Sequence, residues 1–301
     1  MSAIPLTVTM KDFKVDTFPT WCPGCGDFSV LAGVTKALAT AGKHPKDVAI
    51  VSGIGCSSNL PHFLKAYGVH SLHGRSLPVA QGIKLANPDM VVIATGGDGD
   101  GYGIGAGHWL HAMRRNLDIT YVVMNNEIYG LTTGQTSPTS LVGHKTKSTP
   151  YGNIEMPVNP VGIALMAGAT FVARGFSGDA KTLASLVQQA IEHKGFSLVD
   201  VQSPCVTYNK LNTYDWHRER VYNLQEAGHD VSDFGVAVQR ALEWPTNDPA
   251  GKEPIGIFYQ AQGRPTYEES ERAYQVHKNP ARAAKLGVTG EQRKELLAQL
   301  Y

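Results

Sequence analysis

The stretch DMVVIATGGDGDG, residues 89–101, joins a continuous apolar run to a glycine-rich end, which predicts a buried strand that runs into a turn. A helix-like segment over 104–115 and a second apolar run, DITYVVMNN over 118–126, follow it. Apolar strands that alternate with helices indicate a parallel sheet covered on both faces. Because parallel strands end at one edge of a sheet, the turns after these two strands are expected to lie together.

The same alternation continues on either side of this unit. Upstream, apolar positions at helical spacing predict a helix after CPGCG, and the run DVAIVSGIG over 47–55 predicts a strand. Downstream, a strand, a helix and another strand are predicted over 169–176, about 180–193 and 196–205. The predicted fold class is therefore α/β, a parallel sheet flanked by helices.

Two segments fall outside this alternation. Residues 130–160 are polar and rich in Gly, Pro, Ser and Thr, and a loop of this length predicts a functional role, such as a lid or a partner contact. After about residue 210, charged and aromatic residues become more frequent and no strand order is visible. We therefore predict an α/β domain over 1–210 and a partly helical C-terminal extension over 211–301 that contacts a partner subunit.

The composition excludes several classes of protein. The 301 residues carry a formal net charge of +1, so bulk charge favours neither nucleic acid nor a membrane surface as a partner. No apolar run reaches the roughly 18 residues that a membrane-spanning helix needs, and the N-terminal segment lacks the pattern of a secretory signal. We expect a cytoplasmic protein whose cysteines stay reduced.

The glycine-rich turn GGDGDGYGIGAG, residues 96–107, matches neither common phosphate-binding motif. A Walker loop requires Gly-Lys followed by Ser or Thr, and a dinucleotide fingerprint requires the spacing G-x-G-x-x-G, whereas these glycines alternate. What remains is Asp98 at one strand end and Asn126 at the next. Their oxygens, with a backbone carbonyl and phosphate oxygens, suit Mg²⁺. The plain alternative is that Asp98 caps a helix and Asn126 makes a turn.

The Gly-Asp-Gly at 97–99, followed by paired asparagines at 125–126, resembles the signature of thiamine-diphosphate enzymes. The resemblance implies that Asp98 and Asn126 hold Mg²⁺ and that Ile128 adds its carbonyl oxygen. It also implies that the diphosphate and the thiazolium of thiamine diphosphate lie against Gly99, Asp100, Gly130 and Leu131.

The chain has four cysteines, of which Cys22 and Cys25 form a CxxC pair in WCPGCGDF, residues 21–28. The pair alone fits a redox disulfide, half of a zinc site or a corner of an iron–sulfur cluster. A redox pair leaves Cys56 and Cys205, each at a predicted strand end, without a purpose, and structural zinc usually takes two close-spaced pairs. Four thiolates beside a cofactor site fit a 4Fe–4S cluster best, while the zinc and redox interpretations stay open.

Six stretches, in order, resemble the β subunit of the 2-oxoacid:ferredoxin oxidoreductases. They cover roughly residues 19–210 and are TWCPGCGDF, SGIGCSSNLPHFL, HSLHGRSLPVAQGIKLANPD, GGDGDGYGIG, NNEIYGLTTGQTSPTS and SPCVTYN. The resemblance implies thiamine-dependent oxidative decarboxylation of a 2-oxoacid with coenzyme A to acyl-CoA and CO₂. Electrons then pass through a 4Fe–4S cluster, held by the four cysteines, to ferredoxin, and the reaction can also run in reverse.

The same resemblance implies roles for further residues. His73 lies near the reacting centre as a catalytic residue that contacts substrate or cofactor, the alternative being a purely structural hydrogen bond. Arg75 either anchors a carboxylate or joins an interior salt bridge. The cofactor is touched from the side of the cluster by Ile54, Gly55, Cys56 and Ser57.

Thiamine enzymes also need a second α/β domain and a glutamate for the aminopyrimidine ring, and this chain is too short to hold both domains in full. An α subunit is therefore expected to complete the site, in a dimer of such pairs. The GQTSPTS loop resembles the 2-oxoglutarate type slightly more than the pyruvate type. The alternatives are a subunit of a non-redox thiamine-dependent decarboxylase, which does not need the cysteines, and a non-catalytic partner that keeps a zinc site.

Overall fold

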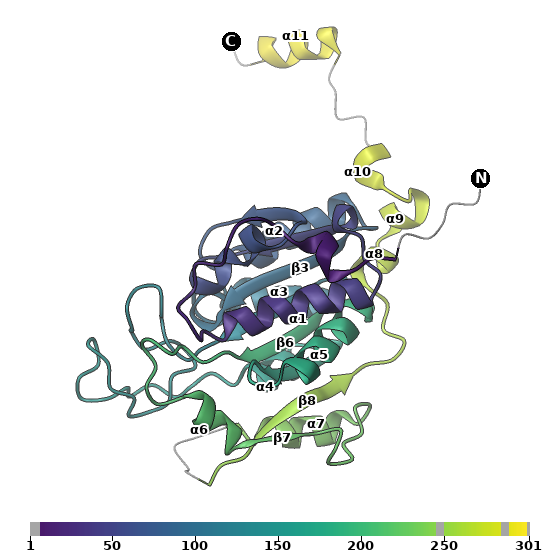
Figure 1. Ribbon diagram of the computed structural model, residues 1–301. Coiled ribbons are helices and arrows are strands. Elements are labelled where there is room, and N and C mark those ends of the chain that lie inside the picture. The colour runs from purple at the N-terminus through teal and green to yellow at the C-terminus, as the bar shows by residue number, and fades with distance from the viewer. Residues whose placement is uncertain (1–6, 245–249, 284–288, 300–301) are drawn as a thin grey trace.

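The strand predicted within residues 89–101 is part of one mixed sheet (Figure 1). The computed structural model describes residues 7–244, 250–283 and 289–299. Within these residues the strands are β1 (Val48–Ser52), β2 (Tyr67–His70), β3 (Val91–Gly97), β4 (Thr120–Asn125), β5 (Phe171–Phe176), β6 (Ser197–Gln202), β7 (Val221–Asn223) and β8 (Glu253–Gln260). They pair in the order β2-β1-β3-β4-β6-β5-β8-β7, and the six from β1 to β6 are parallel.

The central strands form because their side chains are apolar on both faces. β1 reads VAIVS and β4 reads TYVVMN, and every residue of both strands is buried. Such continuous runs are typical of parallel strands with helices on both sides. The prediction of a parallel α/β sheet is confirmed.

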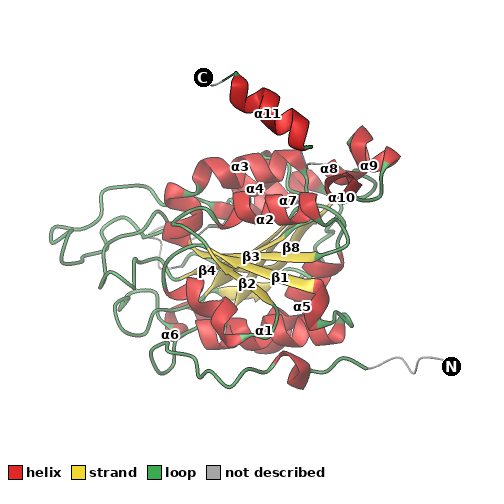
Figure 2. Cartoon of the chain, turned by 90° about the horizontal axis from the view of Figure 1, so that it is seen from above, coloured by secondary structure: helices red, strands yellow, loops and turns green. Residues whose placement is uncertain are grey.

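Two layers of helices cover the sheet (Figure 2). In chain order the helices are α1 (Asp27–Thr40), α2 (Ser76–Ala86), α3 (Ala106–Arg115), α4 (Pro160–Met166), α5 (Ala180–Glu192), α6 (Tyr214–Arg218), α7 (Phe234–Ala241), α8 (Tyr267–Ser270), α9 (Arg272–Val276), α10 (Pro280–Ala283) and α11 (Gly290–Ala298). Helices α2, α3, α4 and α7 share one apolar core with the sheet, and α1 and α5 share the other. In α3, for example, Trp109, Ala112 and Met113 lie at the spacing of one helical face and are buried.

The strand order changes direction between β1 and β3. The chain leaves β1 toward β2 on one side and leaves β3 toward β4 on the other, while β1 and β3 pair directly. In open parallel sheets this switch point leaves a crevice at the carboxyl ends of the strands, where ligands bind. The crevice here opens between the turn after β1, which begins at Gly53, and the turn after β3, which begins at Asp98.

The sheet continues beyond residue 210, which corrects the expectation that no strand order would follow there. β8 pairs antiparallel with β5, and β7 pairs parallel with β8, so both strands extend the main sheet. These strands were not predicted from the sequence because β7 has only three residues. In addition, β8 pairs with a strand about 80 residues earlier, across a bulge at Val172 and Ala173. The rest of the described part of 211–299 is helical or irregular.

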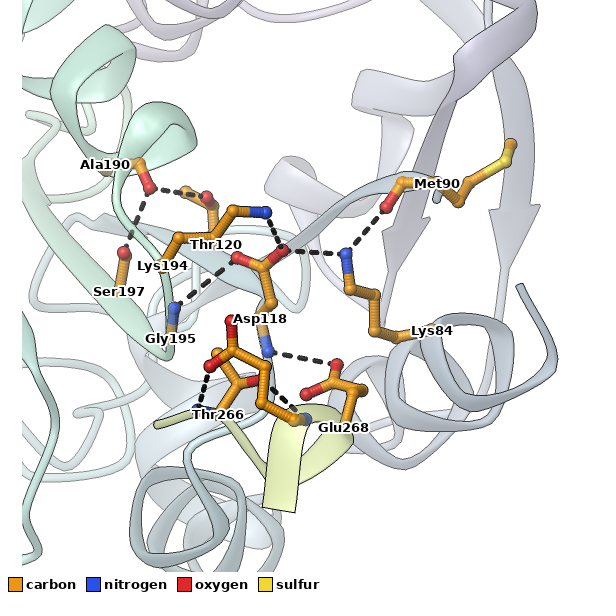
Figure 3. A network of polar contacts seen from close by, with 11 residues as sticks. Lys84, Met90, Asp118, Thr120, Ala190, Lys194, Gly195, Ser197, Thr266 and Glu268 are labelled. Carbon is orange, nitrogen blue, oxygen red and sulfur yellow. Dashed lines mark hydrogen bonds and ion pairs between the residues drawn. The ribbon is translucent and has the colours of Figure 1, made fainter. Parts of the chain in front are cut away.

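The opposite, amino edge of the sheet is closed by a polar network (Figure 3). Asp118 precedes β4 and accepts hydrogen bonds from Lys84 at 2.8 Å and from Lys194 at 3.3 Å. Lys84 also donates to the Met90 carbonyl at 3.0 Å, and the Asp118 amide donates to Glu268 at 3.2 Å. This network attaches the C-terminal segment around α8 to the body of the sheet.

None of the described helices combines the length and the apolar character that crossing a bilayer requires.

Candidate active site

The turns after β3 and β4 meet at the carboxyl edge, as the sequence predicted. Gly97 pairs with Met124 in the sheet register, so Asp98 and Asn126 follow neighbouring strand ends. One cavity lies between them. It is lined by every cofactor and magnesium residue predicted from the sequence, namely Ile54, Gly55, Cys56, Ser57, His73, Asp98, Gly99, Asp100, Asn126, Ile128, Gly130 and Leu131.

Asp98 is a buried carboxylate that lacks a cationic partner among the described residues. Its Oδ2 lies 2.7 Å from the Thr139 hydroxyl, which is positioned to donate to it. Burial raises the pKa of Asp98 to about 6, and hydrogen bonds from Ser137, Thr139 and the Asn126 backbone lower it only in part. A desolvated carboxylate of this kind favours a bound cation.

Asn126 begins a tight turn at the edge of the cavity. Its side-chain oxygen accepts from the Ile128 amide at 3.1 Å, and its carbonyl accepts from Asn209 at 3.0 Å. Glu127 between them has φ of 56°, in the left-handed region that only a well-supported turn imposes on such a residue. The turn therefore brings Asn126 and Ile128 to the same cavity.

Glu127 is itself an unusual residue. Its side chain is buried, and neither carboxylate oxygen has a hydrogen-bond partner among the described residues. Burial, followed by the neighbouring carboxylates of Glu253, Asp98 and Asp200, raises its pKa well above the usual range. The buried position of Glu127 therefore favours its neutral, protonated form.

At two positions of the site, a glycine is required because a neighbouring side chain lies too close for a Cβ atom, and not because of the backbone conformation. A Cβ at Gly99 would lie 2.1 Å from the Tyr129 ring, and a Cβ at Gly53 would lie 2.0 Å from the Asp100 carboxylate. Any side chain at either position would displace its neighbour. The walls of the cavity are therefore fixed by packing.

Asp100 joins three loops by one oxygen. Its Oδ1 accepts from the Ile54 amide at 2.9 Å, from the Gly74 amide at 2.7 Å, and lies 2.8 Å from His73 Nδ1. The turn after β1, the loop before α2 and the glycine-rich turn are thus tied together. His73 lines the cavity and keeps 42% of its side chain exposed.

The four cysteines gather around the same end of the sheet. A Cβ at Gly130 would lie 3.5 Å from Cys205 Sγ and 3.8 Å from Cys56 Sγ, so these two thiols flank Gly130. The CxxC turn is fixed by bonds from the Cys25 amide to the Cys22 carbonyl at 2.9 Å and from the Gly26 amide to the Pro204 carbonyl at 3.3 Å. All four cysteines are free, and Cys22 is the exposed one.

The thiols stand in a negative environment. Burial, then the Asp27 carboxylate and the other cysteines, raises the pKa of Cys56 to about 12 and that of Cys25 further. Burial also raises the pKa of Asp27 to about 6. Thiolates at these positions therefore require a compensating positive charge. Within the described residues, no three His, Cys, Asp or Glu side chains form a group that could hold a single metal ion.

Two family models match adjacent parts of the chain. Residues 40–201 match the C-terminal TPP-binding domain of thiamine pyrophosphate enzymes, and residues 205–276 match the C-terminal region of the pyruvate ferredoxin oxidoreductase β subunit. The chain is 46% identical over 285 residues to a 2-oxoacid:ferredoxin oxidoreductase subunit beta of Saccharolobus solfataricus. This alignment covers 90% of this chain and 92% of the relative.

The chain belongs to the family of 2-oxoacid:ferredoxin oxidoreductase β subunits. It is also 42% identical to a 2-oxoglutarate synthase subunit KorB of Archaeoglobus fulgidus, over 76% of this chain and 88% of that one. A solved 2-oxoglutarate:ferredoxin oxidoreductase from Magnetococcus marinus, with 2-oxoglutarate, coenzyme A and succinyl-CoA bound, superposes with a TM-score of 0.85 at 41% identity. That match covers 98% of this chain and 97% of the other. The predicted family and enzyme class are confirmed, and the oxidoreductase is favoured over the non-redox decarboxylase.

Sequence reasoning missed several residues of the site in this β subunit. Tyr129 and Thr132 line the cavity, and Thr139 reaches Asp98 from the long loop after β4. That loop was predicted to be functional, but nothing in its spacing distinguishes Thr139 from its neighbours. Arg75, for which an interior salt bridge was one alternative, has its Nη1 3.4 Å from the carbonyls of Gly74 and Ile104 instead.

Proposed function

We propose that this β subunit oxidises 2-oxoglutarate to succinyl-CoA and CO₂, using thiamine diphosphate held through Mg²⁺ and a 4Fe–4S cluster that passes electrons to ferredoxin. The observation that carries the proposal is that one cavity contains Asp98 and Asn126 together with Cys56, while Cys205 flanks the same Gly130. Cofactor residues and thiols thus meet at a single strand edge. The relatives named for 2-oxoglutarate support this substrate over pyruvate.

The donor set fits Mg²⁺ and a diphosphate. Asp98, Asn126 and the Ile128 carbonyl would supply the hard oxygen ligands that Mg²⁺ prefers. The raised pKa of Asp98, caused by burial, is relieved when a cation binds beside it. Ser57 Oγ is buried in the same cavity without a partner among the described residues, so it is available to a ligand.

Bound thiamine diphosphate would supply the chemistry that releases CO₂ from the 2-oxoacid. The residues of this chain hold it, orient it and exclude water. Gly99 and Gly130 line the cavity with backbone atoms, and Leu131 gives an apolar surface. His73 lines the cavity with part of its side chain exposed, and the buried Asp100 lies behind it.

A cluster fits the cysteines better than zinc does. Zinc binds four sulfurs at about 2.3 Å from one centre, and no group of this kind is arranged for a single ion in the described residues. A 4Fe–4S cluster takes one cysteine at each iron, so its four ligands stand further apart. Cys22, Cys25, Cys56 and Cys205 are the proposed ligands, with the exposed Cys22 on the side facing solvent.

The α subunit is proposed to cover the cavity. Side chains that are large, apolar and exposed cluster on loops at this edge, with Leu72, Leu131, Tyr151, Ile154 and Met156 between 56% and 98% exposed. Exposed apolar side chains in such number mark a protein interface. We place the aminopyrimidine glutamate on that subunit, with two αβ pairs forming the complex, residues 211–301 as a further contact, and the complex in the cytoplasm.

The substrate is tested with the complex made by co-expression of both subunits. Initial rates of coenzyme A-dependent ferredoxin reduction are measured with 2-oxoglutarate and with pyruvate. We expect kcat/KM for 2-oxoglutarate to exceed that for pyruvate by at least about 10-fold, since a distal carboxylate offers a charge-assisted contact. Equal values for the two acids would refute the substrate assignment and leave the enzyme class unchanged.

The cluster is tested by iron and acid-labile sulfide analysis and by the visible spectrum before and after dithionite. About four irons for each chain, with a broad absorption that bleaches, is the expected result. Cys205→Ser should lose most of the iron and stop ferredoxin reduction while the thiamine diphosphate content stays near that of wild type. An unchanged spectrum in this variant would show that the ligand set is wrong.

A further inference from the structure

His73 sits on a loop that the structure holds rigidly. The loop follows β2, and its Ser71 amide and hydroxyl both bond to the Ser52 carbonyl, at 2.9 and 2.7 Å. Gly74 has φ of 70°, and a Cβ there would lie 2.6 Å from the Gly105 amide nitrogen, so the loop packs directly against the glycine-rich turn. These contacts fix the backbone on either side of His73, whose side chain lines the cavity.

The bond to Asp100 fixes which ring nitrogen carries the proton. Asp100 Oδ1 already accepts from the amides of Ile54 and Gly74, so it acts as an acceptor toward His73 as well. The 2.8 Å contact is then a bond donated by His73 Nδ1–H. In the neutral imidazole, the unshared electron pair then lies on Nε2, and the side chain, 42% exposed, lines the cavity.

We propose that Asp100 is a positioning residue that holds His73 in this tautomer, and that His73 Nε2 accepts the thiol proton of coenzyme A. This inference rests on the proposed function and adds a role that the function alone does not assign. It concerns the co-substrate because the thiol of coenzyme A carries a proton that a base must remove, whereas a 2-oxoacid enters with its carboxyl group already ionised. A thiol must lose its proton before it becomes a good nucleophile.

The proposed transfer balances without a further reactant. The S–H bond of coenzyme A breaks, and an Nε2–H bond forms on His73. The sulfur electron pair forms the thioester bond as the acyl carbon separates from its carrier. The two electrons of the oxidation leave toward ferredoxin, and the proton leaves His73 for solvent through the exposed rim.

Rapid mixing of the anaerobic αβ complex separates the two parts of the reaction. Cluster absorbance after addition of 2-oxoglutarate alone reports the step before coenzyme A, and succinyl-CoA formation reports the step that follows. In His73→Gln we expect the first step to stay within about twofold of wild type and the second to fall about 100-fold, the lower range for loss of a general base. Asp100→Asn keeps the shape but removes the charge, and should slow the second step about 10-fold, as when the partner that orients a histidine is lost.

A binding measurement gives a readout that does not depend on turnover. Calorimetry on the cofactor-free complex compares coenzyme A with desulfo-coenzyme A, which lacks the thiol. Wild type should bind coenzyme A about 3- to 10-fold more tightly, the range for one hydrogen bond, and His73→Gln should remove the difference. His62→Gln is the matched control, since His62 is an exposed histidine on the turn after β1 that does not line the cavity.

The outcomes are distinguishable. Equal loss of both steps in His73→Gln, with iron and thiamine diphosphate content unchanged, would place His73 in decarboxylation and overturn the thiol assignment. Unchanged succinyl-CoA formation would also overturn it. A wild-type complex whose cluster 2-oxoglutarate cannot reduce would refute the proposed function, and the thiol role with it.

Discussion

The pKa values of two buried carboxylates, one at each edge of the sheet, shift in opposite directions. At the amino edge, burial would raise the pKa of Asp118, but Lys84 and Lys194 lower it below the usual value (Figure 3). At the carboxyl edge, Asp98 is fully buried with hydroxyl and amide donors alone, and its pKa rises to about 6. At the amino edge Asp118 is paired with lysines, whereas at the carboxyl edge Asp98 has no cationic partner among the described residues.

This difference distinguishes a carboxylate that stabilises the fold from one that is suited to bind a ligand. A complete ion pair stabilises the fold and has no need of a ligand. An unbalanced carboxylate destabilises the fold and persists where a ligand will balance it. Each of the following predictions tests this contrast, from the largest effect to the smallest.

Asp98→Ala should abolish turnover. Loss of a group that only orients a metal ligand already costs about 10–100-fold, so loss of a proposed ligand should lower kcat/KM by more than 100-fold. Equilibrium dialysis should find Mg²⁺-dependent thiamine diphosphate binding absent, with iron content unchanged. Cofactor occupancy equal to wild type would show that the two edges do not differ as described.

Asp118→Asn should destabilise the complex and leave the chemistry intact. The substitution leaves the Lys84 ammonium buried without a negative partner in the network, with neutral oxygens such as the Met90 carbonyl as its acceptors. Loss of one partner from a buried pair costs about 3–5 kcal/mol. Urea unfolding measures the cost, and the kcat of the folded fraction should match wild type. A stable variant would mean that the amino edge does not depend on this pair.

In the magnesium-free complex, Asp98 and Asp118 should contribute pH dependences of opposite sign to the free energy of unfolding. Because the folded state raises the pKa of Asp98 from 3.8 to about 6, it binds this proton more tightly than the unfolded chain does. The free energy of unfolding should therefore fall as pH rises from about 4 to 6, by up to about 3 kcal/mol. Asp98→Asn should lack the share of Asp98 in this decrease, while the share of Asp27, whose pKa is also raised to about 6, remains. Asp118, with its lowered pKa, contributes stability that is present above pH 4 and lost as pH falls.

Lys194→Ala should have the smallest effect. Its side chain is 75% exposed, so its bond to Asp118 is screened by water. We expect a loss of about 0.5 kcal/mol by urea unfolding, and 0.5 M salt should reduce it further. A loss as large as that of Asp118→Asn would show that the exposed lysine, rather than Lys84, balances the carboxylate.

The sequence allowed prediction of the site residues that directly follow the ends of strands. Asp98, Asn126 and Cys56 each follow a continuous apolar run, and parallel pairing brings such ends to one edge. Periodicity alone therefore placed them together. The magnesium and cluster roles of these residues remain proposals that rest on the resemblance and the cavity.

Other features left no local signal. Lys84 and Asp118 are 34 residues apart and meet only because α2, which packs against β1 and β3, ends at the amino edge of the sheet, where Asp118 precedes β4. Thr139 comes from a loop without periodicity, so its reach toward Asp98 depends on the path of that loop. β8 was missed because its pairing is antiparallel and distant in sequence. Contacts of this kind depend on tertiary packing, which a single sequence does not encode in its spacing.

The long loop after β4 carries Thr139 at one end and the exposed Tyr151 and Ile154 further along. A partner that orders the exposed part also restrains the hydroxyl that contacts Asp98. Binding of the partner and binding of Mg²⁺–thiamine diphosphate should then strengthen each other by the same factor, because thermodynamic coupling is reciprocal. An orphan β subunit would load its cofactor poorly, and reactive chemistry would begin only in an assembled enzyme.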